Sequence, residues 1–142
     1  MQELLTVVAI ALGLSAPDPR VISAIDKACH GDEKCGAEGV VFADLESGFN
    51  EWPKPFSHDA RDGTSCGVFQ LPCSFVRLHD LDEQAAQWVK LRDWSLKQCS
   101  ALPENERLAG LASGGCFHGR MLSRSRRAMA DDALFAAHFA MR

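Results

Sequence analysis

Two polar residues stand out as candidates for chemistry because apolar residues surround them. Glu46 follows a largely apolar run from Ala37 to Leu45, and Gln70 lies in the apolar segment "GVFQL". An apolar setting penalises the anionic form of a carboxyl group and so favours the protonated acid. A glutamic acid that stays protonated near neutral pH can act as a general acid. We therefore predict that Glu46 donates a proton and that the loop after it shapes the site.

The order of the motifs around these residues resembles a known superfamily. Glu46-Ser47 is followed by a loop and then by Ser65-x-Gly67-x-x-Gln70. This pattern is similar to that of goose-type lysozymes and soluble lytic transglycosylases, whose signature is a Glu-Ser pair followed by Gly-x-x-Gln. The likeness covers residues 40 to 76 and is much looser in "LAGLASGG" downstream.

The resemblance implies a peptidoglycan-cleaving enzyme that acts on the β-1,4 bond between N-acetylmuramic acid and N-acetylglucosamine. Glu46 would be the general acid that protonates the leaving oxygen, because this bond breaks through an oxocarbenium-like state. We expect the apolar pocket around Glu46 to be lined by one or more of five residues, Phe42, Ala43, Leu45, Phe49 and Trp52.

The resemblance also suggests residues that contact the glycan. These are Ser47, Trp52, Ser65, Gly67, Gln70 and Ser113. Trp52 and Phe56 would stack on sugar faces. Each motif residue has a structural alternative: Ser47 as a helix-capping hydroxyl, and Gln70 as an amide that satisfies loop backbone.

A second carboxylate would decide which product forms. Asp59 and Asp62 lie in the loop, loosely where goose-type lysozymes carry acidic residues that position water, although both also suit turns. With a base, hydrolysis gives lysozyme products. Without one, Glu46 would act as acid and then as base on the muramyl 6-hydroxyl, which is the transglycosylase route.

One departure from the family keeps two other functions open. Members commonly carry a Tyr-Asn-x-Gly segment near the acid, whereas this chain has no tyrosine and the matching positions are Leu111, Ala112, Ser113 and Gly114. The protein would then be a non-catalytic peptidoglycan-binding or structural relative that keeps the cleft without turnover. The third possibility is a disulfide- or metal-stabilised helical interaction module.

The elements that must position these residues are mainly helical. Helix signals cover residues 4–16, 19–29, 34–46, 80–99, 103–113 and 125–141, with Asp18 and either Asp80 or Asp82 as N-caps and Ala133, Leu134, Ala137 and Phe139 facing inward on the last helix. We predict one mainly α, lysozyme-like (α+β) domain over residues 1–142. A small irregular β-hairpin region near residues 63–71 would flank a saccharide cleft.

Composition limits the partners. A chain of 142 residues with 46% hydrophobic content can bury one core. Its net charge of −4 gives no electrostatic case for nucleic acid. We expect the basic cluster Arg120, Arg124, Arg126 and Arg127 to form a solvated helix face or loop, and residues 4–16 to form a packed helix too short to span a membrane.

Six cysteines favour disulfides and an oxidising compartment, although the sequence permits about 15 pairings. The local pairs Cys29–Cys35, Cys66–Cys73 and Cys99–Cys116 are preferred. The rival is a zinc site that draws on Cys29, His30, Cys35, Cys116 and His118, which we disfavour because the usual ligand spacing is absent. We expect no metal or cofactor. We expect a monomer that acts on peptidoglycan glycan strands outside the cytoplasm, as a secreted or periplasmic protein or as part of a phage virion.

Overall fold

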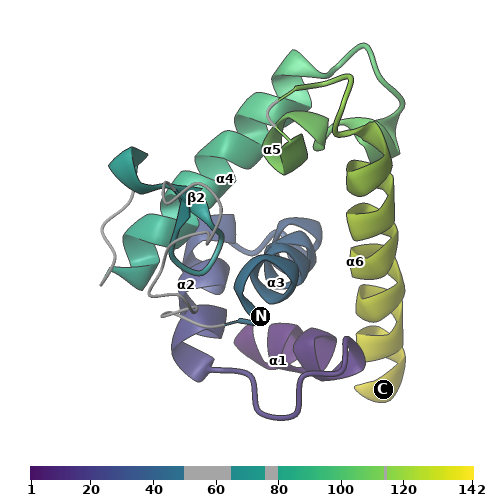
Figure 1. Ribbon diagram of the computed structural model, residues 1–142. Coiled ribbons are helices and arrows are strands. Elements are labelled where there is room, and N and C mark those ends of the chain that lie inside the picture. Colours follow the sequence, from purple (N-terminus) through teal and green to yellow (C-terminus); the bar gives the residue numbers. More distant parts are fainter. Residues whose placement is uncertain (50–64, 76–79, 114) are drawn as a thin grey trace.

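One helix, α3, forms the centre of the fold. The computed structural model describes residues 1–49, 65–75, 80–113 and 115–142. Its elements are α1 (Gln2–Ala11), α2 (Pro19–Cys29), α3 (Glu33–Ser47), β1 (Ser65–Cys66), β2 (Leu71–Pro72), η1 (Cys73–Phe75), α4 (Leu81–Gln98), η2 (Glu104–Glu106), α5 (Ala109–Ser113) and α6 (Arg120–Ala140). α3 contacts α1, α2, α4 and α6, and Figure 1 shows it between them. The predicted fold class, mainly α with a small β-hairpin, is confirmed.

The first two helices follow their sequence signals. α1 buries Leu4, Leu5, Val8 and Ala9, so the apolar N-terminal segment packs as a helix. It ends at Ala11 rather than at residue 16, because the chain turns at Gly13, whose φ is +98°. At the start of α2, Asp18 accepts a hydrogen bond from the backbone N–H of Arg20, and Pro19 occupies the first helical turn. This is the capping arrangement that the sequence predicts.

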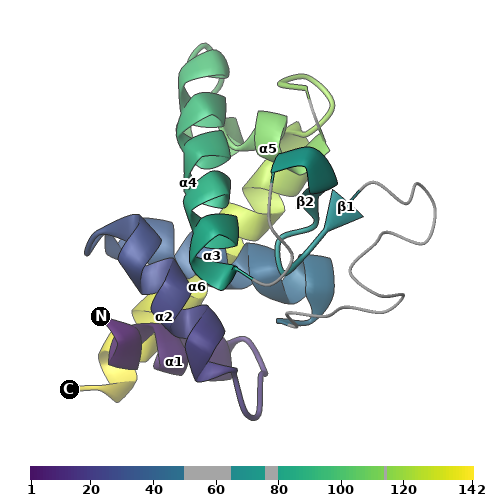
Figure 2. The same cartoon turned by 90° about the vertical axis from the view of Figure 1, so that its left-hand side faces the viewer.

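The sheet is a short hairpin. β1 pairs with β2 in antiparallel register, with Ser65 opposite Pro72 and Cys66 opposite Leu71. Figure 2 shows the hairpin on the same side of the molecule as the C-terminal end of α3. The two candidate motifs therefore lie on the same side of the molecule.

The C-terminal half wraps α3 with two long helices. Asp80 caps α4 by accepting a hydrogen bond from the N–H of Glu83. The predicted helix from residue 103 is instead two pieces, η2 and α5. α6 begins at Arg120, several residues before the predicted start, and its N-cap Gly119 offers no capping side chain that could have signalled this.

All three predicted disulfides are present: Cys29–Cys35, Cys66–Cys73 and Cys99–Cys116. The first closes the turn between α2 and α3, the second joins β1 to the segment after β2, and the third ties the end of α4 to the segment before α6. The three cysteines of the rival zinc site are therefore all in disulfides, Cys29 with Cys35 and Cys116 with Cys99. Within the described ranges, no group of three or more metal-ligating side chains gathers.

Two expectations for α6 were wrong. Arg126 and Arg127 are buried, at 7% and 2% exposure, rather than solvated. Both meet carboxylates of α3, which makes burial of the charges tolerable. Phe139 is 66% exposed because the inward face of the last turns is formed by Ala133 and Ala137.

None of the helices in the described ranges is both long and apolar enough to cross a membrane.

Candidate functional site

Glu46 lies where the buried helix α3 reaches the surface. Every residue from Cys35 to Ala43 is buried, whereas the Glu46 side chain is 29% exposed. The helix ends at Gly48, whose φ of 66° is left-handed, and the N–H of Phe49 returns to the carbonyl of Ala43 at 3.0 Å. This left-handed ending turns the chain sharply and leaves Glu46 in the last helical turn.

The surroundings of Glu46 differ from the expected apolar pocket. Nη1 of Arg126 donates a hydrogen bond to Oε1 of Glu46 at 2.7 Å, forming an ion pair between α6 and α3. The Arg126 side chain is only 9% exposed, and Leu45, expected as a pocket wall, is 46% exposed. Of the other expected wall residues, Phe42, Ala43 and Phe49 are buried and Trp52 lies outside the described residues. The expectation did not include Arg126 because it considered only neighbours in sequence, and Arg126 lies 80 residues away.

Aromatic contacts connect this ion pair to the hairpin. Phe69 stacks on Trp88 with ring centroids 5.4 Å apart, and Trp88 meets Phe42 at 5.6 Å. The guanidinium of Arg126 lies 4.6 Å from the centre of the Phe42 ring, within cation–π range. One aromatic cluster thus supports both the Gly-x-x-Gln turn and the cation that binds Glu46.

Within the turn, Gly67 and Gln70 have clear structural roles. Nε2 and the backbone N–H of Gln70 both donate to the carbonyl of Gly67, at 2.9 and 3.2 Å. Gly67 has φ +79°, and a Cβ there would lie 2.3 Å from Oε1 of Gln84. Oε1 of the buried Gln84 accepts the N–H of Val68 at 2.9 Å. The close approach at Gly67 is therefore made by a buried side chain of α4, and the half-buried Gln70 satisfies backbone in its turn.

The serines and the remaining predicted residues fall in different places. Ser47 Oγ donates to the carbonyl of Ala43 at 3.0 Å, one turn back in α3, which fits the structural alternative. Ser65 is half-buried in β1, and Ser113 is the last residue of α5. The second-carboxylate candidates Asp59 and Asp62 and the aromatic candidates Trp52 and Phe56 lie outside the described residues.

A second acidic residue near Glu46 was missed at the sequence level. Asp44 is half-buried in the same turn of α3, and desolvation by burial raises its pKa above the ordinary value. This is the electrostatic behaviour that the sequence led us to expect of Glu46. The local sequence does not distinguish the two residues, because Asp44 lies within the same apolar run that Glu46 follows.

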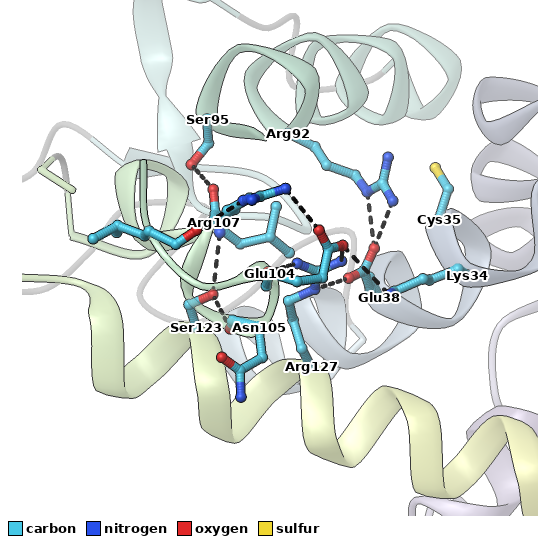
Figure 3. A network of polar contacts seen from close by, with 12 residues as sticks. Lys34, Cys35, Glu38, Arg92, Ser95, Glu104, Asn105, Arg107, Ser123 and Arg127 are labelled. Carbon is cyan, nitrogen blue, oxygen red and sulfur yellow. Dashed lines mark hydrogen bonds and ion pairs between the residues drawn. The ribbon is translucent and has the colours of Figure 1, made fainter. Parts of the chain in front are cut away.

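A buried ionic network next to this region was also missed (Figure 3). Glu38 is 1% exposed in the middle of α3 and accepts from Arg92 of α4 at 2.7 and 2.9 Å and from Arg127 of α6 at 2.7 Å. Arg127 also reaches the carbonyl and the carboxylate of Glu104. The positive charge of Arg127 lowers the pKa of Glu104. Each carboxylate oxygen of Glu38 thus meets a guanidinium, and the network joins three helices.

The helices α3 and α6 are therefore held by three acid–base pairs. From one end to the other these are Glu33–His138, Glu38–Arg127 and Glu46–Arg126. Only the Glu38 pair is fully buried, the Glu33 pair is exposed, and the Glu46 pair lies between these extremes. The Glu46 carboxylate is the one that combines partial exposure with a buried counter-ion.

A surface hollow of about 410 Å³ between α2 and α4 is separate from this region. Its lining includes Lys27, His30, Asp82 and Asp93 and none of the motif residues.

The candidate site thus consists of the Glu46–Arg126 pair at the end of α3 and the adjacent hairpin turn from Gly67 to Gln70. Comparison with models of known protein families, with curated proteins and with solved structures finds no match to this chain.

Proposed function

We propose that the protein cleaves the β-1,4 bond between N-acetylmuramic acid and N-acetylglucosamine in peptidoglycan, with Glu46 as the acid–base residue. The observation that carries the proposal is the position of Glu46: it is partly exposed at the end of a buried helix, and aromatic contacts connect its counter-ion Arg126 to the Gly67–Gln70 turn. The resemblance of both motifs to goose-type lysozymes and lytic transglycosylases supplies the reaction type.

In the proposed reaction, the Glu46 carboxyl group gives its proton to the glycosidic oxygen as the bond to the muramyl C1 breaks. The proton of the attacking nucleophile then goes either to the resulting Glu46 carboxylate or to a second carboxylate. If the nucleophile is the muramyl 6-hydroxyl, a 1,6-anhydro ring closes and the enzyme is a lytic transglycosylase. If Asp59 or Asp62 activates water instead, a reducing end forms and the enzyme is a lysozyme.

One observation favours a second function, a peptidoglycan-binding relative without turnover. The first step needs a carboxylic acid, whereas Glu46 forms an ion pair with the guanidinium of Arg126 at 2.7 Å. The absent tyrosine points the same way. The acid role therefore requires that the pair loosen, or that the proton sit on the oxygen that Arg126 does not contact.

The proposed function also implies where the protein acts and which partner it binds. Three disulfides support an oxidising compartment, as in secreted or periplasmic proteins or a phage virion. Glycan strands of the cell wall are the partner, and a monomer suffices for the reaction, alone or within a virion or secreted assembly.

The test is digestion of purified cell-wall sacculi followed by mass analysis of the released sugars. Wild-type protein is compared with Glu46→Gln, with Asp44→Asn and with Glu33→Gln, which removes an exposed carboxylate at the other end of α3. Glu46→Gln should be slower by at least ~100-fold, because general acid catalysis typically supplies 10²–10⁴. Glu33→Gln should match wild type.

The released products distinguish the transglycosylase, the lysozyme and the non-catalytic hypotheses. Anhydro-muropeptides identify a transglycosylase, and reducing ends identify a lysozyme. Equal rates for wild type and Glu46→Gln would remove Glu46 from the mechanism, and a loss confined to Asp44→Asn would move the acid role to Asp44. Sacculi that bind wild-type protein without any release would support the non-catalytic relative.

A further inference from the structure

Arg126, the counter-ion of Glu46, is largely buried although the carboxylate that it pairs with is partly exposed. The Arg126 side chain is 9% exposed, and within the described ranges its only hydrogen bond is the one from Nη1 to Oε1 of Glu46. Its Nε is buried with no hydrogen-bond partner there. A buried donor without an acceptor costs free energy, and such costs concentrate at functional sites.

Two contacts keep this guanidinium in place. The ring of Phe42 lies beneath it at 4.6 Å and limits its movement toward the core. The next residue, Arg127, is bound by Glu38 and Glu104, which fixes the rotation and height of α6 at this point. Arg126 therefore offers Nη1 from a fixed position.

This arrangement makes the two oxygens of Glu46 unequal. Oε1 faces the N–H donor of Arg126, whereas Oε2 accepts no hydrogen bond from the described residues. Because Oε1 already accepts a charge-assisted hydrogen bond and no described residue donates to Oε2, Oε2 is the favoured oxygen for the proton of a protonated Glu46. A side chain tethered by one oxygen also loses rotamers that would point the other oxygen away.

We propose that Arg126 is a positioning residue that selects Oε2 of Glu46 as the proton-donating and proton-accepting oxygen. The inference rests on the proposed function, because it concerns how Glu46 faces the glycosidic oxygen. Arg126 itself touches neither the glycan nor the reacting atoms in this scheme.

The first test reads the pairing directly and does not depend on activity. In ¹⁵N NMR spectra, the side-chain N–H protons of a held and shielded arginine exchange slowly with water. The Arg126 signals should be resolved in wild type, and their exchange should accelerate at least ~10-fold in Glu46→Gln but not in Glu33→Gln. Unchanged exchange in Glu46→Gln would show that the pair does not hold Arg126, and the proposal would fail.

The second test uses initial rates on soluble, peptide-bearing glycan strands. Arg126→Gln should lower kcat by about 10- to 100-fold with KM within about threefold, because misplacing a catalytic group by 1 Å costs about 10²-fold. Arg126→Lys, which keeps the charge, should recover part of the loss. The matched control is Arg124→Gln, an exposed arginine of the same helix, which should keep the wild-type kcat.

The combined variant distinguishes positioning from a general loss of structure. In the Glu46→Gln background, Arg126→Gln should cause no further loss, because residues that act as a unit are not additive. If Arg126→Gln matches Arg124→Gln while Glu46→Gln is inactive, the positioning role is refuted and the proposed function stands. If wild type releases nothing, the proposed function fails, and with it the role of Arg126 in catalysis, whatever the exchange experiment finds.

Discussion

Removing the charge of Glu38 should destabilise the protein more than any other single carboxylate change in the described part of α3. Glu38→Gln keeps the shape of the side chain but leaves Arg92 and Arg127 without their shared counter-ion. Both guanidinium groups are buried, with 8% and 3% of their side chains exposed. Neither can turn to solvent without moving its helix.

The size of the effect follows from this burial. Breaking a buried ion pair by removing one partner costs about 3–5 kcal/mol. Glu104 is 61% exposed and still neutralises Arg127 in part, so the lower end applies, about 3 kcal/mol. For a chain of this length, that loss corresponds to a fall in Tm of roughly 10 °C.

Urea denaturation of the oxidised protein, followed by circular dichroism, measures the free energy of unfolding. Glu33→Gln is the control, since Glu33 is 47% exposed and pairs with the exposed His138, and it should change the free energy by less than ~1 kcal/mol. A Glu38→Gln protein within about 1 kcal/mol of wild type would refute the claim that Glu38 compensates two buried cations.

Three further perturbations test other parts of the structure. Gly67→Ala should destabilise by about 2 kcal/mol or more, because φ is +79° and the new Cβ would lie 2.3 Å from a buried amide oxygen; Gly115→Ala, with open space, should be near neutral in the same urea assay. Replacing both cysteines of Cys99–Cys116 by serine should cost about 3 kcal/mol, and wild-type protein should take up alkylating reagent only after reduction. The pKa of Glu104 is lowered from 4.5, so its contribution to stability is present above that value and is lost as pH falls through the folded pKa. Glu104→Gln should therefore lose less Tm than wild type when the pH is lowered from about 5. An identical dependence of Tm on acid pH in the two proteins would contradict this.

Local signals in the sequence were enough to predict most helices and all the disulfides. Asp18 and Asp80 cap their helices as predicted, since capping depends on residues within one turn. The bonded cysteines are 6, 7 and 17 residues apart, so choosing the nearest partner sufficed. The helix end at Gly48 that presents Glu46 is equally local.

The partners of the buried charges could not be predicted in this way. Glu38 meets arginines 54 and 89 residues away, and Glu46 meets one 80 residues away. Nothing in a helical repeat indicates which charged residue turns inward, and a row of arginines usually marks a solvated face. The candidate site was therefore chosen by its motif, while its electrostatic surroundings depend on the packing of α6 against α3.

Because Arg126 and Arg127 are adjacent, the position of α6 along its axis sets both of their ion pairs with α3. One arginine is clamped inside the protein by Glu38, and its neighbour meets the carboxylate at the rim. Sliding α6 by a single residue, about 1.5 Å along its axis, would misalign both at once. Substitutions far from Glu46 that weaken the Glu38–Arg127 ion pair should therefore make the orientation of the Glu46 carboxylate less well defined while the helices remain folded.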